Sequence, residues 1–196
     1  NTLPENQILS GYSEIFKHSL ISKNKQFREL VKLDKTSFDL KTIYESVQIK
    51  NNIVLIDKKE FRERKSLNFG HTLGHAIESY FLNTDKKLLH GEAISIGIIL
   101  ATYISHKLFN FPKNDLKLIK SHLDKLYEKI EISDSDIESV LELLKHDKKN
   151  SHGKVNFILI KEIGEPVYDV QVSNELIRKS FRYYLGWIST SVNITK

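Results

Sequence analysis

The sequence predicts a mainly α-helical domain, a multi-helix bundle with one small β-hairpin near its C-terminal end. Apolar residues recur at helical spacing from Ile8 to about Leu144. The pattern changes at KVNFILIKEIGEPVYDV, where β-branched and aromatic residues flank Gly164, a residue typical of turns. With 196 residues, of which 40% are hydrophobic and 28% charged, the chain can form a core of its own.

The helical spacing divides the first part of the chain into separate helices. We expect them over residues 6–22, 25–33, 38–56, 65–81, 90–109, 113–129 and 134–146. Pro112 follows FNF, and SDSDIE supplies Ser and Asp caps at a helix start. The hairpin is expected near 154–171, and SNELIRKSFRYYLGWI then returns to helix. The sequence has no internal repeat and no Gly-rich phosphate loop, so residues 1–196 are predicted to form a single domain.

Composition restricts the partners and the kind of metal site. The chain has no cysteine, so a metal would have to be held by His, Asp or Glu. The net charge of +5 comes from dispersed basic residues, which does not favour a nucleic-acid partner. No apolar run approaches the roughly 18 to 20 residues of a membrane span, and no signal peptide is present, so we expect a cytoplasmic protein. The chain begins with Asn1 and contains no Met, from which we expect a fragment or a processed chain.

Three histidines indicate a metal site. LNFGHTLGHAIE sets His71 and His75 four residues apart, on one face of a helix. LLHGEAISIGIILA places His90 at the start of an apolar helix, where the helix dipole also favours an anion. Two histidines and a carboxylate can form a catalytic zinc site with an open coordination position. The alternative is a pair of partly buried histidines that bind backbone groups.

The sequence alone leaves the carboxylate open among Glu14, Glu60, Glu78 and Glu92. Gly70 and Gly74 lie beside the histidines, and each costs a helix about 1 kcal/mol relative to Ala. They indicate either close approach of backbone or a ligand, or tight packing of helices.

A row of polar residues precedes the histidines. Arg64, Asn68, His71 and His75 follow at spacings of four, three and four, which predicts one continuous helical stripe. Such a stripe offers donors for a carboxylate or phosphate and groups for proton transfer.

These motifs closely resemble the catalytic C-terminal domain of the 3-dehydroquinate synthase family. The resemblance lies in the KxxxxxxDxxExxxR pattern of residues 50–64, in LNFGHTLGHAIE and in LHGEAISIG. SGYSEIFKHSLI is also similar to the family's GLAEVIKYGLI, and HDKKNSHGKVNFILIKEIG to its Asp-Lys-Lys segment and following strand. The resemblance covers nearly all of the chain.

The resemblance implies a role for each site residue. It implies a Zn²⁺ or Co²⁺ site formed by Glu14, His71 and His90. His75 would act on substrate and protons, and Glu60 would accept a proton. The substrate-binding positions would be Lys17, Lys50, Arg64, Asn68 and either Lys148 or Lys149, of which Lys148 is preferred.

The family converts 3-deoxy-D-arabino-heptulosonate 7-phosphate to 3-dehydroquinate and phosphate in the shikimate pathway, with NAD as cofactor. Its enzymes are homodimers and carry an N-terminal NAD-binding domain, which this chain lacks. We therefore expect the chain to bind metal and not to turn over alone.

Three other readings remain open from the sequence. The first is a related sugar-phosphate cyclase that forms epi-valiolone or deoxy-inosose, although retention of Asn68 and His75 favours dehydroquinate synthase. The second is an NAD- and metal-dependent alcohol or glycerol dehydrogenase. The third is a non-enzymatic helical module that binds RNA, which should show a basic face with interleaved aromatic residues.

Overall fold

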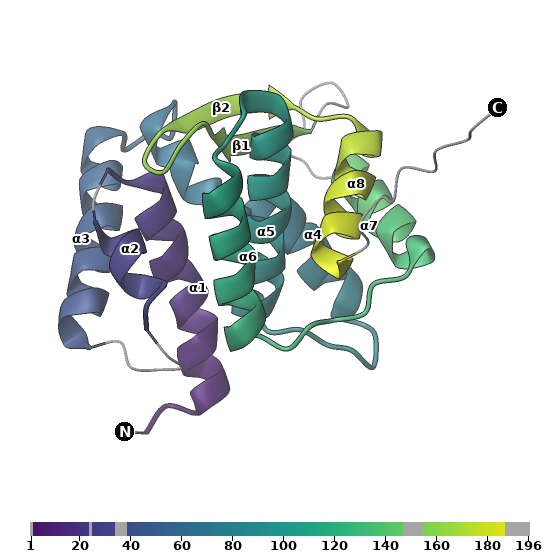
Figure 1. Ribbon diagram of the computed structural model, residues 1–196, viewed down its shortest axis with the longest axis horizontal. Coiled ribbons are helices and arrows are strands. Elements are labelled where there is room, and N and C mark those ends of the chain that lie inside the picture. Colours follow the sequence, from purple (N-terminus) through teal and green to yellow (C-terminus); the bar gives the residue numbers. More distant parts are fainter. Residues whose placement is uncertain (1, 24, 34–38, 147–154, 187–196) are drawn as a thin grey trace.

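The computed structural model describes residues 2–23, 25–33, 39–146 and 155–186, and these form a helical body with a small sheet across one end (Figure 1). The elements are α1 (Glu5–Ile21), α2 (Gln26–Leu30), α3 (Leu40–Ile56), the 3₁₀ helix η1 (Glu63–Asn68), α4 (His71–Phe81), α5 (His90–Phe109), α6 (Lys113–Leu126), α7 (Asp134–His146), β1 (Asn156–Ile160), β2 (Pro166–Gln171) and α8 (Asn174–Leu185). The mainly α prediction with one hairpin is confirmed, and most boundaries agree within a few residues.

Helix α5 is the central element of the core. It contacts α1, α4, α6, α8 and β1, and Ile94, Ile98 and Ile104 are fully buried. Because α5 is enclosed on several sides, the position of its first residue, His90, is fixed relative to α1 and α4.

Helix α5 also corrects an expectation about apolar length. This helix has 20 residues and contains an 18-residue window with a mean hydropathy of 1.2, so it is long and apolar enough to cross a membrane. The expectation that no apolar run approaches that length is wrong. In the structure 67% of this window is buried inside the domain. Core helices of globular proteins share these properties, and length and composition do not separate the two cases.

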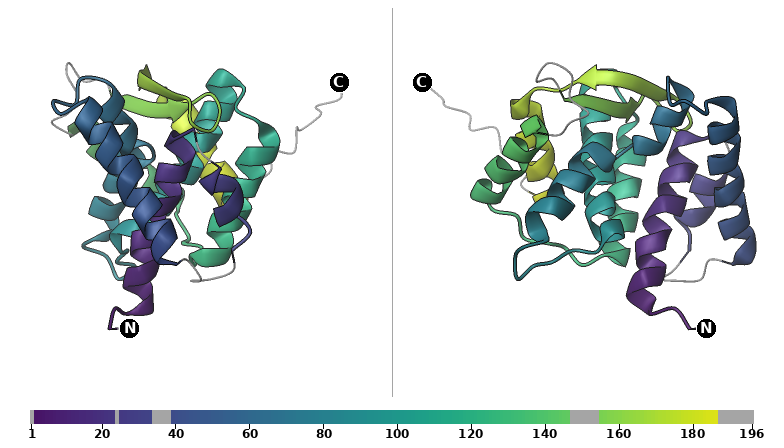
Figure 2. Two further views of the ribbon diagram at one scale, coloured as in Figure 1. Left: turned by 90° about the vertical axis from the view of Figure 1, so that its left-hand side faces the viewer. Right: turned by 180° about the vertical axis from the view of Figure 1, so that it is seen from behind.

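The hairpin lies across one end of the helices, as both views in Figure 2 show. Strands β1 and β2 are antiparallel, with Asn156 opposite Gln171 and a register shift between Phe157 and Leu159. The connecting turn contains Gly164, whose φ of 80° is readily adopted only by glycine. Its N–H donates to the carbonyl of Leu20 over 2.8 Å, so the turn is attached to the end of α1.

Helices α4 and α5 pack with their backbones almost in contact. A Cβ added to Gly97 would lie 2.1 Å from the carbonyl oxygen of Gly70 and 2.8 Å from the nitrogen of Gly74. A Cβ on Gly74 would lie 2.6 Å from Cδ1 of Ile94. Close approach of the two backbones in a tight helix packing therefore accounts for Gly70 and Gly74.

The prediction of one continuous helix over 65–81 is wrong, because the helix is interrupted at Gly70. Residues Glu63–Asn68 form a 3₁₀ helix, Phe69 leaves it with ψ of 126°, and Gly70 takes the left-handed conformation with φ of 76°. Helix α4 begins only at His71. The continuous helical stripe from Arg64 to His75 is therefore wrong as well: its first two members lie on η1 and its last two on α4.

Helix α3 lies at the edge of the molecule, beside α1 (Figures 1 and 2). Ile53 packs against the core, and polar contacts also join the helix to the body. Ser46, the one buried residue of α3, bonds through Oγ to Nδ1 of His18 over 2.8 Å, and Gln26 Nε2 donates to the carbonyl of Thr42 over 3.3 Å. These bonds hold the helix that carries Lys50.

Candidate metal and substrate site

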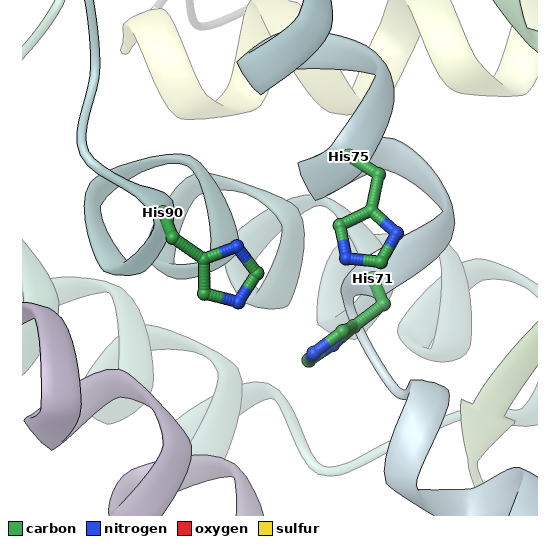
Figure 3. Close-up of side chains that lie close together, drawn as sticks. All are labelled: His71, His75 and His90. Carbon is green, nitrogen blue, oxygen red and sulfur yellow. The ribbon is translucent and has the colours of Figure 1, made fainter.

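Three histidines from two helices meet at the start of α4 and α5. His71 begins α4, His75 follows one turn later, and His90 begins α5. One ring nitrogen from each lies within 4.8 Å of the others. Figure 3 shows the three imidazoles turned toward a common space. The predicted convergence of these histidines is thus present in the structure.

Glu14 of α1 completes this cluster. Its Oε1 lies 3.2 Å from Nε2 of His71 and 3.8 Å from Nε2 of His90. That oxygen is buried and makes no hydrogen bond of acceptable geometry with the residues that the structure describes. The other oxygen, Oε2, accepts from Nζ of Lys17 over 2.7 Å. A buried carboxylate oxygen that faces two imidazole nitrogens is the arrangement expected of a divalent metal site.

The Nδ1 atoms of His71 and His90 each lie within hydrogen-bond distance of an oxygen atom. Nδ1 of His71 lies 3.1 Å from the carbonyl oxygen of Phe69, and Nδ1 of His90 lies 3.0 Å from Oε2 of Glu78. Each of these oxygens can only accept a hydrogen bond, so Nδ1 of each histidine carries the proton. The lone pair of Nε2 then faces Glu14. Metal-ligating histidines are commonly oriented in this way. The donor set of Glu14, His71 and His90 therefore fits a divalent metal.

The other carboxylates have different partners. Glu92 accepts from the N–H of Leu89 over 2.7 Å and so caps α5. Glu60 accepts from Nδ2 of Asn68 over 2.9 Å. Of the four candidates, Glu14 is the one whose oxygen approaches Nε2 of both His71 and His90.

Burial and charge act in opposite directions on Glu14 and Lys17. Burial raises the pKa of Glu14, but the neighbouring His71 imidazole and the charge of Lys17 outweigh it and hold that pKa below its ordinary value. The side chain of Lys17 is 3% exposed, and burial lowers its pKa despite the opposing charge of Glu14. The charge of Lys50, on α3, lowers it further.

A second cluster consists of Glu60, Arg64 and Asn68. Besides its bond to Asn68, Glu60 lies 4.0 Å from Nε of Arg64 through Oε2. Arg64 also donates from a terminal guanidinium nitrogen to the carbonyl of Lys58 over 3.0 Å. Glu60 has a φ of 59°, an uncommon conformation for a residue with a side chain. Strained backbone of this kind often occurs at functional sites.

Asp57 organises the loop that carries this second cluster. Its carboxylate accepts from the backbone N–H groups of Phe61, Arg62 and Arg64 over 3.0, 2.8 and 3.1 Å. These hydrogen bonds lower the pKa of Asp57, and the one from the N–H of Arg62 has the largest effect.

The structure thus groups Glu14, Lys17, His71, His75 and His90, with Lys50 nearby, and separately groups Glu60, Arg64 and Asn68. Lys148 and Lys149 lie outside the described residues. The sequence analysis missed two contributions. One is the hydrogen bond that Glu78 accepts from His90, and the other is the set of loop contacts made by Asp57. Glu78 follows His75 by three residues, and this spacing on one helix face could have indicated a shared role.

A family model described as 3-dehydroquinate synthase C-terminal matches residues 11–150. The chain belongs to this family. It is 37% identical to the 3-dehydroquinate synthase of Parabacteroides distasonis over 187 residues, which cover 93% of the chain and 53% of that protein. It is 38% identical to that of Pelagibacter ubique over 189 residues, covering 90% and 50%. The chain thus spans about half the length of these curated dehydroquinate synthases.

Solved structures of two sugar-phosphate cyclases share the fold. A 2-deoxy-scyllo-inosose synthase complexed with carbaglucose-6-phosphate, NAD⁺ and Co²⁺ matches with a TM-score of 0.74 and 27% identity, over 93% of this chain and 52% of that protein. The 2-epi-5-epi-valiolone synthase of Streptomyces hygroscopicus, with NAD⁺ and Zn²⁺ bound, matches with a TM-score of 0.72 and 20% identity, over 94% and 53%.

Proposed function

We propose that this chain is the metal- and substrate-binding part of a 3-dehydroquinate synthase. That enzyme is a lyase that converts 3-deoxy-D-arabino-heptulosonate 7-phosphate to 3-dehydroquinate with loss of phosphate. The main support is the convergence of Glu14, His71 and His90 in a chain that aligns over 93% of its length with a dehydroquinate synthase. We also propose that residues 1–196 act as a single domain.

The proposed metal ligands are Glu14, His71 and His90, for Zn²⁺ or Co²⁺. A metal bound there would act as a Lewis acid on substrate hydroxyl groups. The Co²⁺ in the structure of the related inosose synthase supports this proposal. The chain's own contribution is a partly buried set of donors already turned toward one another, which reduces the cost of ordering them.

The remaining site residues are proposed to bind the substrate and to transfer protons. Cationic and amide groups would neutralise or bind its carboxylate, phosphate and hydroxyls: Lys17, Lys50, Arg64, Asn68 and Lys148. His75 is exposed beside the metal ligands, and its imidazole suits proton transfer near neutral pH. Glu60 would accept a proton, since its carboxylate is held by Asn68 next to Arg64.

The cofactor NAD would be bound mainly by a separate N-terminal domain, outside residues 1–196. NAD supplies the reversible removal of hydride that such chemistry needs. The inosose synthase that shares the fold binds NAD⁺ and is about twice as long, which supports this division of labour. We further propose that the complete enzyme is a cytoplasmic homodimer without a nucleic-acid or membrane partner.

One experiment tests the proposed activity. The chain is assayed with heptulosonate phosphate, NAD and Zn²⁺, alone and fused to the NAD-binding domain of a dehydroquinate synthase. We expect phosphate and 3-dehydroquinate from the fusion and no turnover from the chain alone. Full activity of the isolated chain would contradict the proposed division.

The same assay separates the rival functions. A ring product from sedoheptulose 7-phosphate or glucose 6-phosphate, with none from heptulosonate phosphate, would assign the chain to another sugar-phosphate cyclase. Formation of NADH without release of phosphate would indicate a dehydrogenase instead.

A further inference from the structure

Glu78 connects helix α4 to the first residue of α5. It lies one turn after His75, and its Oε2 is 3.0 Å from Nδ1 of His90. The contact joins residues from two helices that meet at the histidine cluster. None of the roles proposed above uses this carboxylate.

His90 needs such a contact more than His71 does. The side chain of His71 is 12% exposed, so packing restricts its ring, whereas that of His90 is 41% exposed. An imidazole at the exposed start of a helix can rotate about its side-chain bonds unless a hydrogen bond fixes it. The contact with Glu78 fixes the ring, with Nε2 3.8 Å from Oε1 of Glu14.

We propose that Glu78 is a positioning residue for the metal site. It accepts the Nδ1 proton of His90, which holds the ring in the tautomer and orientation that present Nε2 to the metal. This inference rests on the proposed function, since it assumes that Glu14, His71 and His90 bind a divalent cation.

The acceptors of the two ligating histidines differ in charge. His71 donates to the neutral carbonyl oxygen of Phe69, and His90 donates to the carboxylate of Glu78. A carboxylate behind a metal-ligating histidine is a common means of fixing its tautomer and ring orientation. The more exposed of the two histidines is thus the one whose Nδ1 faces a carboxylate.

A direct role of Glu78 as a ligand does not fit the contacts. Its carboxylate lies on the Nδ1 side of His90, and Glu14 lies on the Nε2 side. The two ring nitrogens point in different directions, so a metal held by Nε2 and Glu14 lies away from Glu78. Glu78 acts through His90 rather than on the metal.

The test measures Co²⁺ binding by the full 196-residue chain, through visible absorption and competition with a chelator. Glu78→Ala is compared with Glu78→Gln, with the ligand variant Glu14→Gln, and with Glu142→Ala, a change of an exposed helical glutamate. Circular dichroism and thermal unfolding report whether each variant folds. Glu78→Leu serves in place of the Ala variant if that one does not fold.

We expect Glu78→Ala to weaken Co²⁺ binding about 10- to 100-fold, the range seen when partners of metal ligands are removed. Its absorption bands at saturation should match those of the unmodified chain, because the ligands are unchanged. Glu78→Gln should recover part of the affinity, since its amide oxygen still accepts the Nδ1 proton. Glu142→Ala should bind as tightly as the unmodified chain.

Two results would overturn the proposal. One is a folded Glu78→Ala, or Leu, variant that binds Co²⁺ within twofold of the unmodified chain. The other is a Glu78→Gln variant that loses Co²⁺ as completely as Glu14→Gln, with altered bands, because Glu78 would then be a ligand. Absence of Co²⁺ binding by the unmodified chain would instead refute the proposed metal site itself.

Discussion

The carboxylate of Glu14 and the ammonium group of Lys17 form an ion pair of 2.7 Å, one turn apart on α1. The pair uses only Oε2 of Glu14, so that Oε1 remains directed at His71 and His90. One carboxylate therefore links a buried lysine to the histidine cluster. A change at Glu14 is expected to affect both.

The first prediction concerns Glu14→Gln. The neutral amide is a poorer metal ligand and leaves the buried charge of Lys17 without its partner. We expect loss of stoichiometric zinc, measured by elemental analysis, and a fall of roughly 1–3 kcal/mol in the free energy of unfolding of the metal-free chain. Glu5→Gln, an exposed change on the same helix, is the control. Retention of stoichiometric zinc by Glu14→Gln would refute Glu14 as a ligand.

The second prediction concerns the contact between α4 and α5. In Gly97→Ala the new methyl group would collide with backbone atoms of Gly70 and Gly74, which cannot rotate away as a side chain can. We expect a loss of roughly 1–3 kcal/mol or more in stability, measured by urea unfolding, together with weaker zinc binding. If Gly97→Ala were as stable as the unmodified chain, the packing of α4 against α5 would leave room for a methyl group, and the prediction would be wrong.

Gly11→Ala is the matched change for this prediction. Gly11 is exposed within α1, and a Cβ there would have no atom within 4 Å. Because alanine favours helix, we expect a gain of roughly 0.5–1 kcal/mol. The two substitutions should therefore shift the urea midpoint in opposite directions.

The third prediction is a loss of stability in acid. Burial lowers the pKa of His18 and of His122 from 6.5 to about 4. The unfolded chain binds these protons more readily, so the stabilisation is complete above pH 6.5 and is lost as the pH falls toward 4. For His18 the loss is at most roughly 3 kcal/mol.

The variant His122→Gln tests this prediction, since glutamine can still bond to the hydroxyl of Tyr12, now 2.8 Å from His122 Nε2. Urea unfolding of metal-free protein between pH 7 and 4 should show a shallower loss for the variant. Parallel curves for the two proteins would show that His122 does not contribute.

The fourth prediction concerns the loop held by Asp57. Asp57→Asn keeps one acceptor oxygen and introduces a donor where the carboxylate accepts three backbone N–H groups. We expect roughly tenfold faster hydrogen exchange at Phe61, Arg62 and Arg64. Asp85→Asn, an exposed change outside the loop, should leave these rates unchanged. Equal rates in Asp57→Asn would show that the loop is held by other contacts.

Local patterns in the sequence predicted much of the fold. Periodicity and end signals indicated α5, α7 and the hairpin close to their observed bounds, because apolar spacing and turn residues act over short ranges. The break at Gly70 was missed, since a glycine within a helical pattern can continue the helix or end it. What decides here is the packing of Gly70 against Gly97, a contact between segments distant in sequence.

The sequence predicted only part of the site, again because some of its contacts join segments that are distant in sequence. The spacing of His71 and His75 is local, and the structure brings both close to His90. The choice of Glu14 depended on family resemblance, because its distance from the histidines is set by how α1 packs on α5. The position of Glu78 at His90 likewise results from the packing of α4 against α5.

The backbone contact at Gly97 has a consequence for how this site is inherited. The separation of α4 and α5, and with it that of His71 and His90, is limited by main-chain atoms instead of by the sizes of core side chains. Apolar residues elsewhere in the core can then be exchanged over evolutionary time without moving the histidines apart. Gly70, Gly74 and Gly97 carry no chemistry themselves, yet their contact preserves the spacing on which the chemistry depends.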